Sequence, residues 1–443
     1  MTTSGVGRRN LLVGGSAAVL GGATAASGTA AAEPATATHV TQQQDARPPN
    51  VLLVYFDDLG YGDLSCYGSS MIQTPHLDQL AREGTRFTHA YSGATVCTPS
   101  RAALLTGRVA PRVGLPHVLF PDHTDGLSAQ EHTIAEYLKS AGYATTCIGK
   151  WHLGKESEHR PIRHGFDEFF GALYSNDMDP FQLWRNDEMI EDAVDQSALT
   201  RRYTEEAIAA IDRAGDDPFF IYLAETMPHL PLAVEPQFDG RSDGGEYGDV
   251  IESLDHYLGV LFKALSERGL REDTLVIVTS DNGPWFDGST GGLRGRKIGT
   301  YEGGLRVPFI VRWPGVVPRG EEHDFPLSVL DLLPTLCGYA GVEPKPDVTL
   351  DGTDIRPVLE GAPSVAHPPI YYFDDQDGSL SAVRDSKWKL HVQREDETTL
   401  RLPELYDLER DPEESYNLAN SHPRVVERLT TIIEDMEEDI ASG

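Results

Sequence analysis

The chain has 443 residues, and 69 aspartates and glutamates against 37 lysines and arginines give it a formal charge of −32. Such an excess of negative charge opposes binding to nucleic acid and to anionic membranes. A hydrophobic fraction of 40% is that of a folded globular protein, and four cysteines are too few for a disulfide scaffold of this length. An anionic substrate would need a pocket whose local charge opposes that of the whole molecule.

The first 32 residues have the pattern of an export signal. Arg8 and Arg9 precede a weakly hydrophobic stretch rich in glycine and alanine, which ends in an alanine-rich cleavage pattern before Glu33. We expect a cleaved twin-arginine signal peptide and export through the twin-arginine translocon to the periplasm, the cell surface or the medium. Cleavage deletes two arginines and no acidic residue, so the mature charge becomes −34. Residues 33–47 are polar and aperiodic, which predicts a disordered lead-in.

Short apolar runs alternate with amphipathic segments over residues 48–362. The expected strands are Val51–Phe56, Tyr143–Ile148, Phe219–Leu223, Leu275–Thr279 and Val307–Arg312. The expected helices are Thr74–Glu83, Glu131–Ala141, Leu199–Arg213, Gly248–Arg268 and Val329–Ala340. This alternation predicts an α/β fold with a large mixed, mainly parallel sheet between layers of helices. In such folds ligands bind at the carboxyl ends of the strands.

The pattern of expected secondary structure changes after residue 362. The expected elements there are the short strands Pro368–Phe373, Leu380–Arg384, Trp388–Val392 and Glu404–Tyr406, followed by the helix Pro423–Ile440. Residues 363–443 are therefore predicted to form a small antiparallel-sheet subdomain with a terminal helix, after a catalytic domain of residues 48–362.

Two pairs of polar residues follow expected strands. Asp57 and Asp58 come directly after Val51–Phe56, and Asp281 and Asn282 come just after Leu275–Thr279. Each pair alone is compatible with a solvated turn. Carboxylate and amide oxygens are the ligands of hard divalent cations, and neighbouring parallel strands would bring the two pairs together. The two pairs therefore indicate a metal site.

The most specific segment is CTPSRAALLTG, residues 97–107. Pro99 suits the first turn of a helix and leaves Cys97 at the helix N-terminus, where free N–H groups and the macrodipole favour negative charge. Arg101, one turn later, faces the same side and can bind substrate oxygens. A structural cysteine before a helix is the alternative interpretation.

This segment resembles the signature of the formylglycine-dependent (type I) sulfatases of the alkaline phosphatase superfamily, in the style of the arylsulfatase A-like group. Further segments are similar to family motifs in the same order: GKWHLG at 149–154, PHLP at 228–231 and KIGTYEGGLRVP at 297–308. The resemblance continues through ELYDL at 404–408 to Asn417 and Leu418 and covers nearly the whole mature chain.

The resemblance implies a modified nucleophile. In this family a formylglycine-generating enzyme oxidises the motif cysteine, so Cys97 is expected to become an aldehyde. One hydroxyl of its hydrate attacks sulfur, and the other later expels sulfate. Arg101, Lys150 and His152 would position and polarise the diol, and His229 and Lys297 would bind sulfate oxygens and help to protonate the leaving group.

The resemblance also implies one bound Ca²⁺, with Mg²⁺ less favoured. Asp57, Asp58, Asp281 and Asn282 would hold it together with the oxygen of residue 97. Some family members place a serine near the histidines, and the motifs do not locate it in this chain. The other cysteines, Cys66, Cys147 and Cys337, are interpreted as packed free thiols, with a Cys66–Cys147 or similar bridge left open.

The predicted function is hydrolysis of aryl or carbohydrate sulfate esters to inorganic sulfate and an alcohol or phenol. One alternative keeps the site and changes the substrate to a phosphonate monoester or a phosphodiester. A second is a catalytically silent sugar-binding protein with the same fold. The motifs specify neither the physiological ester nor the oligomeric state.

Overall fold

A computed structural model describes residues 47–375, 378–392 and 403–442. The predicted signal peptide and lead-in, apart from Arg47, lie outside the described residues. Residues 47–443 form one compact unit. The boundary expected at residue 362 stays a prediction.

The larger sheet has eleven strands within the described part of the chain, in the order β10-β2-β9-β8-β1-β7-β3-β4-β5-β6, with β11 also paired to β2. The strands are β1 (Asn50–Phe56), β2 (Thr85–Tyr91), β3 (Ala144–Lys150), β4 (Glu168–Ala172), β5 (Leu183–Arg185), β6 (Glu188–Glu191), β7 (Phe219–Ala224), β8 (Thr274–Ser280), β9 (Arg306–Arg312), β10 (Glu321–His323) and β11 (Leu327–Ser328). The central strands β8, β1, β7, β3 and β4 are parallel, so their carboxyl ends lie at one edge of the sheet.

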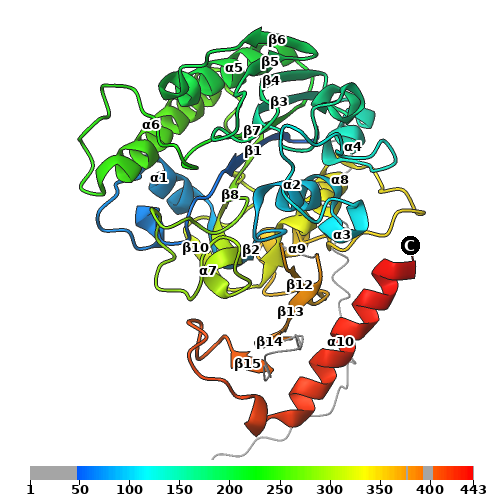
Figure 1. Ribbon diagram of the computed structural model, residues 1–443. Coiled ribbons are helices and arrows are strands. Elements are labelled where there is room, and N and C mark those ends of the chain that lie inside the picture. The colour runs from blue at the N-terminus through cyan, green and yellow to red at the C-terminus, as the bar shows by residue number, and fades with distance from the viewer. Residues whose placement is uncertain (1–46, 376–377, 393–402, 443) are drawn as a thin grey trace, which may run out of the picture. The chain divides into compact units, whose positions relative to one another are not determined.

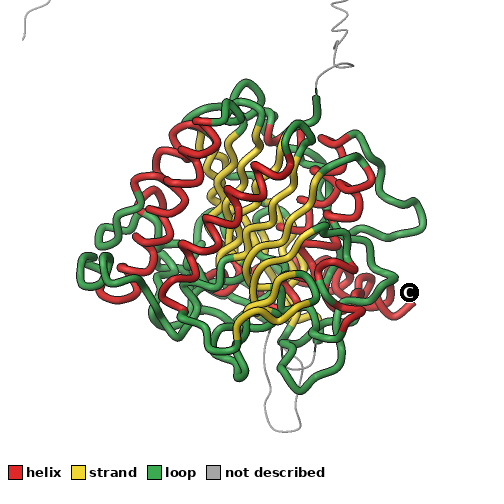
Figure 2. The backbone as a smooth tube through the Cα atoms, turned by 90° about the horizontal axis from the view of Figure 1, so that it is seen from above, coloured by secondary structure: helices red, strands yellow, loops and turns green. Residues whose placement is uncertain are grey.

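Helices cover both faces of this sheet (Figures 1 and 2). One face carries α1 (Pro75–Glu83), α5 (Leu199–Ala214) and α6 (Gly245–Glu267). The other carries α2 (Cys97–Thr106), α4 (Ile134–Ser140) and α8 (Leu332–Ala340), and short helices α3 (Ala110–Val113), α7 (Glu302–Leu305) and α9 (Arg356–Leu359) lie in connections. The predicted sheet between helical layers is confirmed.

Strand β1 shows why the centre of the sheet is apolar throughout. Val51, Leu53 and Tyr55 point into the core beneath α2, α4 and α8. Leu52 and Val54 point into the core beneath α1, α5 and α6. A strand covered on both faces has no polar side to alternate with, which produces the continuous hydrophobic run seen in the sequence.

The smaller sheet is antiparallel and ends in a helix, as predicted. Its strands are β12 (Ile370–Phe373), β13 (Leu380–Asp385), β14 (Trp388–His391) and β15 (Glu404–Asp407), in that order, followed by α10 (Pro423–Ser442). Leu429, Ile433 and Met436 on one stripe of α10 are buried in the same hydrophobic core as Val383 and Leu390 of this sheet.

The expected strands and helices all lie at observed elements, with ends that differ by a few residues. Strands β2, β4, β5, β6, β10 and β11 were not predicted. Strand β2 (TRFTHAY) carries polar residues on its less buried positions, and β5, β6, β10 and β11 have two to four residues each. Short or partly polar strands lack the apolar run by which a sequence identifies a buried strand.

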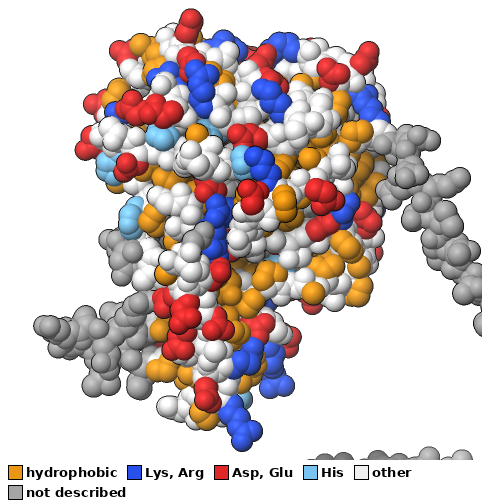
Figure 3. Space-filling view, turned by 90° about the vertical axis from the view of Figure 1, so that its right-hand side faces the viewer, with side chains coloured by type: hydrophobic (Ala, Val, Ile, Leu, Met, Phe, Trp, Pro, Cys, Tyr) orange, Lys and Arg blue, Asp and Glu red, His pale blue; other side chains and the backbone are white. Residues whose placement is uncertain are grey.

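The four cysteines are all free thiols; Cys97, Cys147 and Cys337 are buried and Cys66 is half-buried. The interpretation of Cys66, Cys147 and Cys337 as unpaired thiols is confirmed, and the Cys66–Cys147 bridge does not form. No helix among the described residues has both the length and the hydrophobicity that crossing a membrane requires. On the face in Figure 3, acidic side chains are spread among basic and apolar ones rather than gathered in one patch.

Buried charges join the smaller sheet to α7. Lys389 of β14 is fully buried, and its Nζ lies 3.0 Å from Glu302 Oε1 and 3.1 Å from Glu414 Oε1. Burial alone would raise the pKa of Glu302, but the charges of Lys389, Arg306 and Arg384 outweigh it and lower the pKa to about 2. Glu302 is therefore a carboxylate whose charge is balanced chiefly from the smaller sheet.

We expect Lys389→Met to lower the free energy of unfolding by about 3 kcal/mol, because it leaves two buried carboxylates without their main counter-charge. Lys263→Met is the matched control. Lys263 Nζ lies 3.2 Å from Glu267 Oε1 and the two side chains are 75% and 59% exposed, so its loss is expected to cost less than about 1 kcal/mol. Urea denaturation of the two variants provides the measurement, and equal effects would contradict the assignment.

Candidate active site

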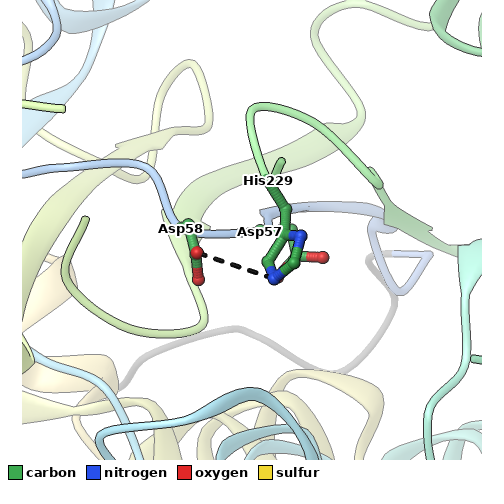
Figure 4. A group of neighbouring side chains, drawn as sticks. All are labelled: Asp57, Asp58 and His229. Carbon is green, nitrogen blue, oxygen red and sulfur yellow. Dashed lines mark ion pairs between the residues drawn. The ribbon is translucent and has the colours of Figure 1, made fainter. Parts of the chain in front are cut away.

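The predicted site residues come from the carboxyl ends of central strands and from the N-terminus of α2. Asp57 and Asp58 follow β1, Asp281 and Asn282 follow β8, and Lys150 ends β3. Lys297 lies in the connection before α7, and His229 lies five residues after β7 (Figure 4).

The carboxylate of Asp57 is buried away from solvent and lies between positively charged side chains. Its Oδ2 is 2.6 Å from Lys150 Nζ and its Oδ1 is 3.6 Å from Arg101 Nη2, with all three side chains fully buried. Burial raises the pKa of Asp57, but the positive charges of Lys150, His229, Arg101 and Lys297 outweigh it and hold the pKa well below its ordinary value. Asp57 is therefore ionised.

Arg101 faces inward rather than toward an open pocket. Its Nη2 donates to Asp281 Oδ2 at 2.8 Å, and its Nη1 donates to the backbone oxygen of Lys150 at 3.0 Å. Its guanidinium carbon also lies 5.5 Å from the centroid of the Tyr55 ring. These contacts fix Asp281 and the end of β3 relative to α2.

Asp58 is the centre of a second group. Asn282 Nδ2 donates to its Oδ1 at 2.6 Å, Lys297 Nζ lies 2.7 Å from Oδ1, and His229 Nε2 lies 3.8 Å from Oδ2 (Figure 4). The backbone N–H of Asp58 donates to Asp281 Oδ1 at 3.1 Å. The φ angle of Asp58 is 65°, a left-handed conformation that is uncommon outside glycine and that these contacts maintain.

Two buried oxygens in this group have no hydrogen-bond partner: Asp57 Oδ1 and Asn282 Oδ1. Buried polar atoms are normally satisfied, so these acceptors indicate a missing positively charged partner. Oxygen atoms of this type suit Ca²⁺. Ligand atoms of Asp57, Asp58 and His229 also lie within 4.8 Å of one another.

Asp281 contributes to the group through hydrogen bonds at both oxygens, from Asp58 and Arg101. Burial and the negative charge of Asp57 raise the pKa of Asp281 well above its ordinary value. The compact cluster of possible metal ligands therefore consists of Asp57, Asp58 and His229, although the sequence analysis assigns His229 to sulfate binding. Asp281, which the sequence analysis expects as a metal ligand, lies next to this cluster and contacts the backbone of Asp58.

Cys97 begins α2, as predicted, with Val96 as the N-cap. The next residue, Thr98, donates its hydroxyl to the backbone oxygen of His152 at 3.0 Å and accepts from the backbone N–H of Leu119 at 3.1 Å. Burial would lower the pKa of Lys297, but the acidic groups of Asp58 and Cys97 raise it above its ordinary value. The backbone N–H of Ile298, next to Lys297, donates to the backbone oxygen of Thr95, two residues before Cys97, at 3.0 Å, so the segments of Cys97 and Lys297 lie side by side.

His152 is a neutral imidazole with one free nitrogen. Its Nε2 lies 2.8 Å from the backbone oxygen of Leu119, which can only accept, so Nε2 carries the proton. Burial and the charge of Lys150 lower the pKa of His152 well below its ordinary value. Its Nδ1 is buried without a hydrogen-bond partner among the described residues and can accept a hydrogen bond.

Two contacting residues, Ser175 and Asn176, were missed by the sequence motifs. Lys150 Nζ donates to Ser175 Oγ at 3.1 Å, and His229 Nδ1 lies 3.0 Å from Asn176 Oδ1. Both residues are buried and follow β4, the parallel neighbour of β3. Their position after a strand was the available signal. Ser175 is the candidate for the serine that family members place near the histidines.

The two glycines of the EGG segment let the site connections approach one another. A Cβ on Gly303 would lie 2.4 Å from the backbone oxygen of Gly295, and one on Gly304 would lie 1.9 Å from that of Gly299. A Cβ on Gly283, next to Asn282, would likewise lie 2.1 Å from the backbone oxygen of Gly303. Only glycine permits the connection that carries Lys297 to pack this closely.

Family comparison agrees with this geometry. Residues 49–342 match the family described as Sulfatase, and residues 296–440 match the family described as N-sulphoglucosamine sulphohydrolase, C-terminal. The chain belongs to the sulfatase family and is an arylsulfatase-like hydrolase.

Individual relatives are similar over nearly their whole length. Arylsulfatase A of Homo sapiens is 40% identical, with 87% of each chain covered. N-acetylgalactosamine-6-sulfatase of Canis lupus familiaris is 33% identical, with 90% of this chain and 87% of the relative covered. The crystal structure of Ps i-CgsB in complex with k-i-k-neocarrahexaose superposes with a TM-score of 0.80 at 30% identity, covering 89% of this chain and 93% of the other.

We expect Ser175→Ala to lower kcat/KM for a sulfate ester by about tenfold, because a hydrogen bond to a charged group contributes about 1.5 kcal/mol. The Lys150 ammonium would keep its contact with Asp57 but lose the one with Ser175, and it would be held less precisely. Ser157→Ala, an exposed serine in a surface turn, is the control. Steady-state kinetics and thermal unfolding of both variants distinguish this effect from a loss of stability; an unchanged kcat/KM in Ser175→Ala would contradict it.

Proposed function

We propose that the protein hydrolyses sulfate monoesters with residue 97 as nucleophile, after Cys97 has been oxidised to formylglycine. The observation that carries this proposal is the pair of unpartnered buried oxygens, Asp57 Oδ1 and Asn282 Oδ1, in the group of charged residues that Cys97 adjoins. Formylglycine supplies a hydroxyl nucleophile when hydrated, and its aldehyde form permits release of sulfate without attack by water on sulfur.

A divalent cation, Ca²⁺ in our proposal, would be held by Asp57, Asp58, Asp281 and Asn282. When bound it neutralises charge on the transferring group and favours the ionised form of the nucleophile. The donor set fits, since it is made of carboxylate and amide oxygens, and two of them, Asp57 Oδ1 and Asn282 Oδ1, accept no hydrogen bond from the described residues.

The histidines have distinct tasks in this proposal. His152 Nδ1, buried and without a hydrogen-bond partner among the described residues, would accept a hydrogen bond from a hydroxyl on residue 97 and so orient it. His229 Nδ1 is directed to Asn176 Oδ1 and to the backbone oxygen of Leu230, 2.6 Å away. With Nδ1 protonated by this arrangement, the imidazolium form of His229 would carry a second proton on Nε2 and deliver it to the leaving oxygen, returning to the neutral ring.

The cations explain how an acidic protein can bind an anion. Three permanent cations, Arg101, Lys150 and Lys297, face three acidic side chains, Asp57, Asp58 and Asp281, so the acidic side chains cannot exceed the cations in charge. A divalent cation added to this balance leaves the pocket positive. Interactions over a few ångströms in a buried site outweigh surface charges that salt screens beyond about 8 Å.

The proposed substrates are aryl or carbohydrate sulfates, because relatives are named arylsulfatase A and N-acetylgalactosamine-6-sulfatase. We also propose export through the twin-arginine translocon, on the strength of Arg8 and Arg9 and the weakly hydrophobic stretch after them. Proteins that this translocon exports cross the membrane already folded. A formylglycine-generating enzyme would therefore act on Cys97 before export.

We expect Cys97→Ala to lower kcat by at least about a thousandfold for an aryl sulfate, with little change in thermal stability, because the side chain supplies the nucleophile. Cys66→Ala, a half-buried thiol outside the site, is the matched control and should keep its activity. Mass spectrometry of the peptide that contains residue 97 shows whether the native protein carries the aldehyde. Near-normal turnover by Cys97→Ala would contradict the proposed mechanism.

Removal of divalent cations should abolish turnover, and Ca²⁺ should restore it better than Mg²⁺. Added Ca²⁺ should also raise the melting temperature of the stripped protein, because binding to the native state alone stabilises it. Asp58→Asn should weaken this calcium-dependent shift by removing one ligand charge. Full activity after exhaustive chelation, or an equal shift in Asp58→Asn, would argue against the cation site.

A further inference from the structure

Large hydrophobic side chains are exposed at several places on the described residues: Met71, Phe120, Met189, Ile190, Val260, Trp285, Phe286, Ile298 and Tyr416. Three of them are close in sequence to residues of the active site. Trp285, Phe286 and Ile298 lie on the connection between β8 and α7, which also carries Asn282 and Lys297. Single exposed apolar residues are common on protein surfaces, but several together indicate a binding surface. These three residues are called the apolar rim below.

Backbone hydrogen bonds fasten the apolar rim to the site. The N–H of Lys297 donates to the oxygen of Pro284, the residue before Trp285, at 3.1 Å. The N–H of Ile298 donates to the oxygen of Thr95 at 3.0 Å, two residues before Cys97. The exposed residues are thus sequence neighbours of groups that bind at the reacting centre.

Arg296 holds the aromatic pair in place. Its Nη1 donates to the backbone oxygens of Trp285 and Gly288, at 2.8 and 2.6 Å, and its guanidinium carbon lies 5.5 Å from the centroid of the Phe286 ring. The Trp285 and Phe286 rings meet edge to face, with centroids 5.0 Å apart. Phe286 is nevertheless 71% exposed, so an ordered aromatic surface is presented to solvent.

Ile298 is held in an unfavourable backbone conformation. Its φ is 80°, which is rare for a β-branched residue and costs on the order of 1–3 kcal/mol. Its side chain is 43% exposed, so burial in the core does not offset that cost. An isoleucine kept in this conformation directly after Lys297 indicates a role at the site.

We propose that the apolar rim binds the ring of the organic group of the sulfate ester, while Lys297 binds its sulfate. This inference rests on the proposed function and adds a preference for esters whose alcohol part is a ring with an apolar face. Aromatic side chains bind both aryl rings and the C–H face of pyranose rings, which share this chemistry.

Binding rather than turnover tests the inference. In the Cys97→Ala protein loaded with Ca²⁺, calorimetry would measure the Kd of phenyl sulfate, of a hexose 6-sulfate and of methyl sulfate, which has no ring. Trp285→Ala and Phe286→Ala are expected to raise the Kd of ring-bearing esters by about three- to tenfold. The Kd of methyl sulfate should change by less than about twofold on the same grounds. Tyr416→Ala, which removes an aromatic ring that is 73% exposed elsewhere, should change none of the three.

The outcomes separate this inference from the proposed function. An unchanged Kd for both ring-bearing esters overturns the apolar rim, and so does equal weakening of all three esters, which would place the effect on the sulfate through Lys297. A larger effect on phenyl sulfate identifies an aryl substrate, and a larger effect on the hexose sulfate identifies a sugar. If the unsubstituted protein, with Cys97 oxidised to formylglycine, failed to hydrolyse these esters, the result would count against the proposed function alone. The dependence of binding on the ring is measured without turnover.

Discussion

The site is organised by one constraint: charges that water cannot reach must be compensated by one another. Asp57, Arg101, Lys150 and Asp281 have no exposed surface, and removing one member would leave another charge uncompensated at a cost of several kcal/mol. Their pairings therefore determine where β1, β3, β8 and α2 can lie relative to one another. The fold and the site are stabilised by the same contacts.

The sequence predicts the central part of this arrangement because its signals are local. An apolar run followed by Asp57 and Asp58 identifies both a buried strand and a polar strand end. The segment from Cys97 to Gly107 likewise specifies both a helix start and a chemistry. Where the residues of a function are contiguous and follow a regular element, residue type and position are sufficient to place them.

What the sequence does not predict depends on contacts between distant segments. Ser175 reaches Lys150 because β4 pairs with β3 in parallel register, and apart from its place after a strand no motif around Ser175 marks it as a site residue. The inward position of Arg101 is similar: helical spacing places it on the face of Cys97, but its partners Asp281 and the oxygen of Lys150 come from two other strands. The contact between Glu302 and Lys389 joins residues 87 positions apart. Pairings of this kind follow from tertiary packing.

The ion pairs of Lys389 have a consequence for how such chains can change over time. Glu302 belongs to the segment that carries Lys297, whereas Lys389 belongs to the smaller sheet, and Glu414 follows that sheet. A smaller sheet transferred from another relative would preserve the fold only if it brought an equivalent buried ammonium and carboxylate. We therefore expect residues 302, 389 and 414 to change together in related chains, because exchanging one sheet alone would leave a buried charge without its partner.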